Sequence, residues 1–150
     1  KMDAETRARA KERLKIASVI LFTLPGIPCI YYGDEIGMEG YSDPFCRMPF
    51  QWNNIDEELL AHYRRLSEIR TKLSVFKDAE YHELFHDENC LIYERRTKGE
   101  VAVVAINMGY NKFDLCFEGE LIDLFTGKRY SNRYTVFTMS YSILSNKSIF

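Results

Sequence analysis

The stretch LPGIPCIYYGDEIGM, residues 24–38, carries more structural information than any other part of this 150-residue chain. A short apolar run is bounded on both sides by residues that interrupt helices: Pro25, Gly26, Pro28 and Gly33. The run is too short for a buried helix, so it predicts one buried β-strand over residues 28–32. Two carboxylates, Asp34 and Glu35, follow at once, and in α/β barrels this end of a strand carries the chemistry.

A helix is predicted before this strand. Apolar residues recur with a helical period over about residues 5–24, and the last two turns are apolar nearly all round. Asp3 is the expected N-cap, and the Pro25-Gly26 pair stops the helix. The apolar end of this helix is expected to lie buried between a sheet and neighbouring helices.

A long loop follows the strand, over residues 33–53. It is rich in glycine, proline and aromatic residues, and this aromatic content favours an ordered, functional loop over a disordered one. A second helix is predicted over about residues 55–73, and Asn54 with Glu57 resembles a capping box at its start.

The rest of the chain has the period of β-strands. Turn signals separate seven short segments, which predict an antiparallel sandwich: 81–85, 90–96, 101–107, 112–117, 121–125, 135–139 and 141–144. The lone strand at 28–32 would need parallel neighbours to cover it, and the chain is too short for a complete eight-fold barrel, which takes about 250 residues. We therefore expect an α+β chain that is the tail of a larger α/β protein.

Composition excludes several classes of partner and site. A net charge of −2 and a pI near 6.0 favour no nucleic-acid partner, and no apolar run is long enough to cross a membrane. The four cysteines (Cys29, Cys46, Cys90, Cys116) lack the spacing of a zinc ribbon and are too sparse for a disulfide scaffold. Reduced thiols in a cytoplasmic protein are the expectation, and residue 1 starts no recognisable signal peptide.

Four segments carry a resemblance to a known family. The segment GIPCIYYGDEIGM, residues 26–38, resembles the eighth barrel strand of the α-amylase family of glycoside hydrolases. DPFCR (43–47) and MPFQW (48–52) resemble its neopullulanase, cyclomaltodextrinase and maltogenic amylase branch, and residues 63–70 are similar to its last barrel helix. The resemblance implies that residues 1–75 are the last helix–strand–helix of a (β/α)8 barrel (helix 7, strand 8, the long loop, helix 8). Residues 76–150 would be the all-β domain, a β-sandwich, that follows the barrel.

The resemblance also implies a retaining hydrolysis of α-glucosidic bonds, in α-glucans or cyclodextrins, by two carboxylates. In the family these follow strands 4 and 5, and a third Asp follows strand 7 in a His-Asp motif, all upstream of the helix at 5–24. The dipeptide His86-Asp87 falls after the strand-8 segment and cannot be that motif. We therefore expect no catalytic residue, no cofactor and no metal ion in this chain, and no activity of the chain alone.

Asp43 and Arg47 are the candidate substrate-binding residues. In the neopullulanase-like branch the matching Asp and Arg are implicated in holding the sugar chain at its non-reducing side. A carboxylate and a guanidinium can clasp sugar hydroxyls and orient each other, and the alternative is an ion pair that only staples the loop. Tyr41 is a weaker candidate for contact with sugar.

Other polar and aromatic residues have plainer interpretations. Asp34 and Glu35 point in different directions from a strand end, so we expect them to bond backbone or a barrel arginine rather than to act as a catalytic pair. Tyr31, Tyr32 and Trp52 are expected to pack in the core. His82 and His86, four apart on a predicted strand, are expected to be a surface or half-buried pair rather than a metal site.

Two further functions stay open at this point. The chain could be a self-contained module that binds oligosaccharide, or a structural interaction domain. In either case the edges of the strand at 28–32 need cover, by rearranged loop or by self-association with a second copy of the chain.

Overall fold

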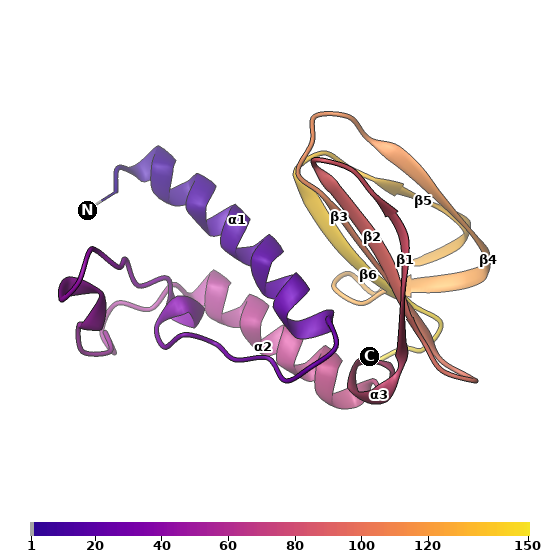
Figure 1. Cartoon of the computed structure of the whole chain (residues 1–150), viewed down its shortest axis with the longest axis horizontal. Helices are drawn as coiled ribbons and strands as arrows, with labels where there is room; N and C mark the ends of the chain where they lie inside the picture. The colour runs from indigo at the N-terminus through magenta and orange to yellow at the C-terminus, as the bar shows by residue number, and fades with distance from the viewer. Residues whose placement is uncertain (1) are drawn as a thin grey trace.

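The computed structural model describes residues 2–150 as a helical part followed by a single antiparallel sheet (Figure 1). No helix within these residues combines the length and the hydropathy needed to cross a membrane. The helices are α1 (Ala4–Thr23), α2 (Glu57–Lys72) and α3 (Val75–Asp78), with 3₁₀ turns at Asp34–Ile36 (η1) and Phe45–Arg47 (η2). The strands are β1 (Glu80–His86), β2 (Cys90–Arg96), β3 (Val101–Asn107), β4 (Phe113–Asp123), β5 (Arg129–Val136) and β6 (Ser140–Ser145).

Helix α1 begins as its sequence predicts, because the Asp3 carboxylate accepts a hydrogen bond from the Thr6 amide at 2.8 Å. The predicted capping box of α2 is wrong. Asp56 is the N-cap and accepts from the Leu59 amide at 3.0 Å, whereas the Asn54 side chain donates to Gln51. An Asp placed one position before the first helical turn satisfies an amide there directly, so the Asn two residues earlier has no role in capping.

The prediction of a strand at 28–32 is wrong for this chain. The segment is extended, but it pairs with no strand among residues 2–150, and Ile30, Tyr31 and Tyr32 are exposed. A parallel strand requires a neighbour to satisfy its backbone groups, and the six strands of this structure pair only with one another.

The sheet has the order β1-β2-β3-β6-β4-β5, and every pairing is antiparallel. The predicted number of seven strands is wrong. Segments 112–117 and 121–125 are one strand, β4, which continues through an irregularity between Cys116 and Glu120, where Gly119 has a φ of 83°. The predicted strand at 135–139 lies instead at 129–136, because cross-strand pairing with β4 stabilises a polar edge strand that has little apolar alternation.

The two faces of the sheet contribute to two different apolar clusters. One face, with Tyr93, Val104 and Ile143, packs against α1 and α2. The opposite face, with Ile92, Val103 and Leu144, forms a second cluster with Leu121 and Val136 of β4 and β5. Figure 1 shows β4 and β5 folded across the sheet, so a single hydrogen-bonded sheet encloses this second core.

Two arginines from other elements satisfy the carbonyls at the C-terminal end of α1. Arg95 of β2, only 1% exposed, donates to the Thr23 carbonyl at 2.8 Å and to the Ala79 carbonyl at 2.9 Å. Arg70 of α2 donates to the Phe22 carbonyl at 2.6 Å. A positive charge at the negative end of a helix dipole is favourable, so the Arg70 contact ties α2 to α1 and the Arg95 contact ties α1 to the sheet.

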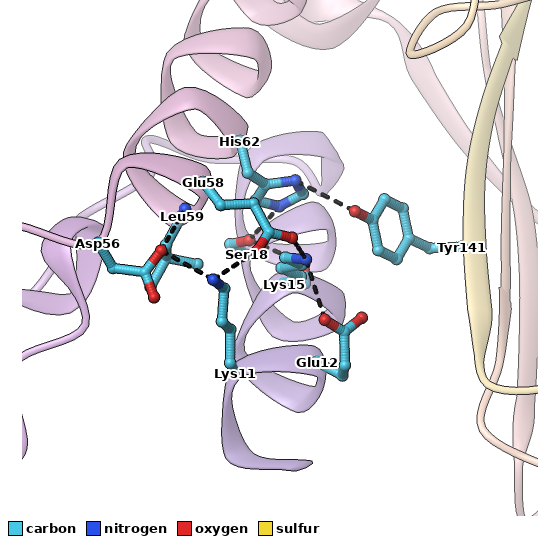
Figure 2. A network of polar contacts seen from close by, with 9 residues as sticks. All are labelled: Lys11, Glu12, Lys15, Ser18, Asp56, Glu58, Leu59, His62 and Tyr141. Atoms are coloured by element: carbon cyan, nitrogen blue, oxygen red, sulfur yellow. Dashed lines mark hydrogen bonds and ion pairs between the residues drawn. The ribbon is translucent and has the colours of Figure 1, made fainter. Parts of the chain in front are cut away.

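A polar network joins α1, α2 and β6 (Figure 2). The Ser18 hydroxyl donates to the Lys15 carbonyl at 2.8 Å, so His62 Nε2 donates to Ser18 Oγ at 2.9 Å and His62 Nδ1 accepts from the Tyr141 hydroxyl at 3.2 Å. Lys15 also bonds Glu12 and Glu58, and the His62 ring stacks on Phe125 with a centroid distance of 5.6 Å. Both ring nitrogens of the neutral imidazole therefore make hydrogen bonds. Burial lowers the pKa of His62 from 6.5 to about 4.

The first prediction concerns acid stability. Between pH 6.5 and pH 4 the unfolded chain binds a proton at His62 that the folded chain excludes, so stability falls as the pH falls, by up to about 1.4 kcal/mol per pH unit. Above pH 6.5 His62 contributes no pH dependence. Urea unfolding of the wild type and of His62→Gln across this range should give a steeper loss for the wild type. Equal slopes would contradict the account, since carboxylate titrations are common to both proteins.

The second prediction concerns the arginine at the end of α1. Arg95→Met leaves the buried carbonyls of Thr23 and Ala79 unpaired, which should lower the free energy of unfolding by about 3 kcal/mol. Arg96→Met is the matched control, because Arg96 is an exposed neighbour whose one ion pair within residues 2–150 is with Glu94, and it should cost less than about 1 kcal/mol. Urea denaturation measures both, and similar losses in the two variants would refute the capping role.

Candidate functional site

The loop of residues 33–53 begins at a glycine that no other residue can replace without movement. Gly33 has a φ of 93°, and a β-carbon there would lie 2.5 Å from the Met38 sulfur. Ile36 of η1 is buried, and its carbonyl accepts from the Asp56 amide at 3.2 Å. The start of the loop is therefore anchored to the N-terminal end of α2.

Asp34 and Glu35 lie in this anchored turn. Glu35 accepts a hydrogen bond from the Gly33 amide at 2.8 Å, so it holds its own turn together. Burial, with a smaller contribution from Glu35, raises the pKa of Asp34. Glu35 therefore bonds a backbone amide, and both residues are part of the turn that begins the loop.

Asp43 and Arg47 form an ion pair on the outer part of the loop. Arg47 Nε lies 3.0 Å from Asp43 Oδ1, and the side chains are 75% and 65% exposed. The 3₁₀ turn η2 follows the cis Asp43-Pro44 peptide, and Arg47 is its last residue. The Cys46 thiol donates to the same Asp43 oxygen at 3.8 Å. One carboxylate oxygen and the guanidinium amino groups thus face solvent, free of partners within residues 2–150.

Two tyrosines of the extended segment support the loop. The Tyr32 hydroxyl donates to the Met48 carbonyl at 2.9 Å, and the Tyr31 and Tyr32 rings lie 5.0 Å apart. A hollow of about 80 Å³, lined in part by Tyr31, Cys46 and Met48, separates the segment from the loop. The prediction that both tyrosines pack in the core is wrong here, because the segment has no strand beside it within the described residues.

The prediction for Trp52 is wrong, whereas the prediction for Tyr41 stays untested. Trp52 is 75% exposed and touches Phe50 with a ring-centroid distance of 4.6 Å, so its predicted core packing is wrong. Its neighbours are loop residues, which do not enclose a side chain of that size. Tyr41 is exposed in the same loop as Asp43, and within residues 2–150 no hydrogen bond ties it to the ion pair.

Sequence reasoning missed the residues that hold the loop. The Tyr32–Met48 hydrogen bond joins residues sixteen positions apart, and no spacing signal marks it. The Cys46 thiol falls within the DPFCR motif, so its closeness to Asp43 could have been inferred from the turn.

The histidines of β1 do not form a metal site. A bulge between Glu83 and Phe85 places His82 opposite Glu94 and His86 opposite Leu91, so the two histidines lie on different faces of the sheet. Each pairs with its own glutamate, and Asp87 accepts from the Asn89 and Cys90 amides in the following turn. No cluster of metal-ligating side chains occurs in the part of the chain that the structure describes.

Comparison with known proteins identifies the family. A model of the α-amylase catalytic domain matches residues 2–78. The maltogenic α-amylase of Bacillus acidopullulyticus is 36% identical over 109 residues, which are 69% of this chain and 19% of that protein. Other curated relatives are an amylopullulanase and a cyclomaltodextrinase. The chain thus spans about a fifth or less of the length of these relatives.

Solved structures agree with this result. The maltogenic amylase from S. marinus is similar with a TM-score of 0.77 and 29% identity, over 91% of this chain and 19% of that one. The α-amylase from Geobacillus thermoleovorans, complexed with acarbose, shares the fold with a TM-score of 0.81 and 22% identity, over 90% of this chain and 33% of that one. The order of helices and then an antiparallel sheet is therefore common to these enzymes. The chain belongs to the α-amylase family of glycoside hydrolases.

Proposed function

We propose that this chain acts as the C-terminal part of a retaining α-amylase-family glycosidase whose substrates are α-glucans or cyclodextrins. Residues 1–75 would complete a (β/α)8 barrel, and residues 76–150 would form the C-terminal β-sandwich domain behind it. The match of a catalytic-domain model to residues 2–78, and relatives several times longer than this chain, support the proposal. The catalytic carboxylates would come from polypeptide upstream of α1.

The observation that carries the proposal is the exposed Asp43–Arg47 pair. Its two side chains are joined by a 3.0 Å contact, while the loop beneath them is held by the Tyr32–Met48 hydrogen bond. A carboxylate accepts from sugar hydroxyls and a guanidinium donates to them, so one fixed pair can bind two adjacent hydroxyls of a pyranose ring. The pair would thus grip an oligosaccharide at its non-reducing side, and Tyr41 would add an aromatic contact.

The extended segment 28–32 is the part of the chain that would pair with strands of the complete barrel. Its backbone pairs with no strand within residues 2–150, where the Tyr31 carbonyl accepts from the Asp34 amide at 3.1 Å, and Ile27 beside it is 94% exposed. In the complete enzyme the segment would become the eighth barrel strand, with its neighbours on either side. In the isolated chain the same edge could pair with a second copy. A cytoplasmic location stays a prediction.

The third prediction separates sugar binding from loop stapling. In the complete enzyme, Asp43→Asn and Arg47→Gln should each raise KM for a cyclodextrin about tenfold or more, because each removes a charged partner of a sugar hydroxyl. The melting temperature should change little, since an exposed ion pair contributes less than about 1 kcal/mol. Glu118→Gln, an exposed change in the β part, is the control for lost surface charge. Unchanged KM with a lowered melting temperature would favour the stapling role.

The fourth prediction concerns activity. The isolated chain should release no reducing sugar from pullulan, cyclodextrin or maltoheptaose, because it contributes no catalytic carboxylate pair. The gene should encode a His-Asp motif shortly before α1. Hydrolysis by the purified chain, or an upstream reading frame without that motif, would refute the proposal that the catalytic carboxylates come from polypeptide upstream of α1.

A further inference from the structure

A carboxylate in the loop of residues 33–53 is tied to the N-terminal end of α1. Glu39 Oε1 accepts from Arg7 Nη1 at 2.7 Å, and Glu39 Oε2 accepts from the Met2 amide at 3.0 Å. Both carboxylate oxygens therefore have a donor, one near the start of α1 and one just before its N-cap. The bonded residues lie 32 and 37 positions apart, so these contacts hold the loop against a distant part of the chain.

The Glu39 side chain is largely shielded from water. It is 11% exposed and the Arg7 side chain 35%, whereas Glu5 and Arg9, which pair on the same helix, are 84% and 63% exposed. A pair shielded from water is screened less by salt than a pair in solvent. The Met2 amide and the Arg7 guanidinium hold the pKa of the Glu39 carboxyl below its usual value, so the carboxylate is ionised at neutral pH.

A second cation on the same face of α1 supports this contact. Arg7 and Lys11 lie one helical turn apart, and Arg7 Nη2 also donates to the Gly37 carbonyl at 3.4 Å. Lys11 donates to the Asp56 carboxylate at 2.8 Å (Figure 2), and the Asp56 amide donates to the Ile36 carbonyl at 3.2 Å. The backbone that leaves η1 is thus held from α1 at two places, directly by Arg7 and through Asp56 by Lys11.

The backbone at Glu39 lies close to the turn that carries the Asp43–Arg47 pair. Glu39 and Gly40 line the hollow of about 80 Å³ together with Cys46. A β-carbon at Gly40 would lie 4.0 Å from the Cys46 β-carbon, so the two stretches of backbone are close neighbours. Cys46 precedes Arg47, and its thiol donates to Asp43 Oδ1 at 3.8 Å. A displacement of Glu39 would therefore reach the turn and its ion pair.

The position of that turn depends on contacts outside it. The Arg47 amide donates to the Pro44 carbonyl at 3.0 Å, a local bond that sets the shape of the turn and leaves its place in the molecule open. The contacts that fix its place lie on either side of it. Glu39 is bonded before the turn, and Met48 accepts from the Tyr32 hydroxyl after it.

We propose that Glu39, paired with Arg7, is a positioning residue for the Asp43–Arg47 pair, which it holds in the place where the pair meets the hydroxyls of a sugar. Both Glu39 oxygens are taken by donors of the protein, so Glu39 acts through the loop and does not touch the sugar. The sugar contact rests on the proposed function, whereas the effect of Glu39 on the geometry of the pair does not. Misplacing a group that only binds substrate raises KM and leaves kcat unchanged.

The first part of the test measures geometry, in the ¹⁵N-labelled chain without sugar. Glu39→Gln keeps the size of the side chain and removes its charge, so the backbone amide signals of residues 43–47 and the Arg47 Nε signal should shift. Glu5→Gln is the matched control, because it removes the same charge from an exposed ion pair of the same helix, and it should leave these signals in place. Unchanged signals of residues 43–47 in Glu39→Gln overturn the positioning role.

The second part is a double-mutant cycle in the complete enzyme. Glu39→Gln should raise KM for a cyclodextrin about fivefold at unchanged kcat. Arg7→Lys keeps the charge that pairs with Glu39, so it should raise KM less than Arg7→Met does. In the Asp43→Asn background Glu39→Gln should have no further effect on KM, because its role passes through that pair.

The outcomes separate this proposal from the proposed function. Additive effects of Glu39→Gln and Asp43→Asn on KM, or a loss of kcat in Glu39→Gln, overturn the positioning role, since they mark a general loss of structure. A KM that Asp43→Asn leaves unchanged overturns the sugar contact instead. The shifts of residues 43–47 then still decide whether Glu39 positions the pair.

Discussion

The structure depends on which donors hydrogen-bond the backbone carbonyls at the C-terminal end of α1. Four carbonyls at that end lack partners within the helix, and α1 has no basic residue in its own last turn. The positive charges come instead from Arg70 of α2 and Arg95 of β2, which donate to the Phe22 and Thr23 carbonyls. Burying a guanidinium without a carboxylate partner is tolerable here because the helix dipole supplies the opposing charge. One helix end thus joins the helical part to the sheet.

The same contacts determine where the candidate site lies. Arg70 also bonds the Gly26 carbonyl, so the segment that leaves α1 starts from a fixed position. The segment then runs without a strand partner to Tyr32, whose hydroxyl holds the loop at Met48. The Asp43–Arg47 pair is exposed on this supported loop. Figure 1 shows the loop at the end of the helical part that lies away from the sheet. Its position thus follows from the cap of α1 together with the hydrogen bonds that join Ile36 to Asp56 and Tyr32 to Met48.

Local patterns in the sequence predicted much of this arrangement. The bounds of β2 and β3 agree with the predicted ranges, because a short apolar run bounded by turn signals marks a strand that is covered on both faces. Predictions failed where structure depends on distant partners: the segment 28–32 has no neighbouring strand among the described residues, and β5 is a polar strand formed by pairing with β4. The ion pair of Asp43 with Arg47 was predictable as one of two alternatives, since both residues lie in one short motif.

We propose that residues 28–32, which pair with no strand among the described residues, form a barrel strand in the complete enzyme. Amide hydrogen exchange at Cys29, Ile30, Tyr31 and Tyr32 tests it most directly, because exchange reports backbone pairing residue by residue. The account predicts fast exchange at these amides in the isolated chain, beside slow exchange in β2 and β3, and strong protection of the same amides in the full-length enzyme. Protection in the isolated chain without self-association, or fast exchange in the full-length enzyme, would contradict it.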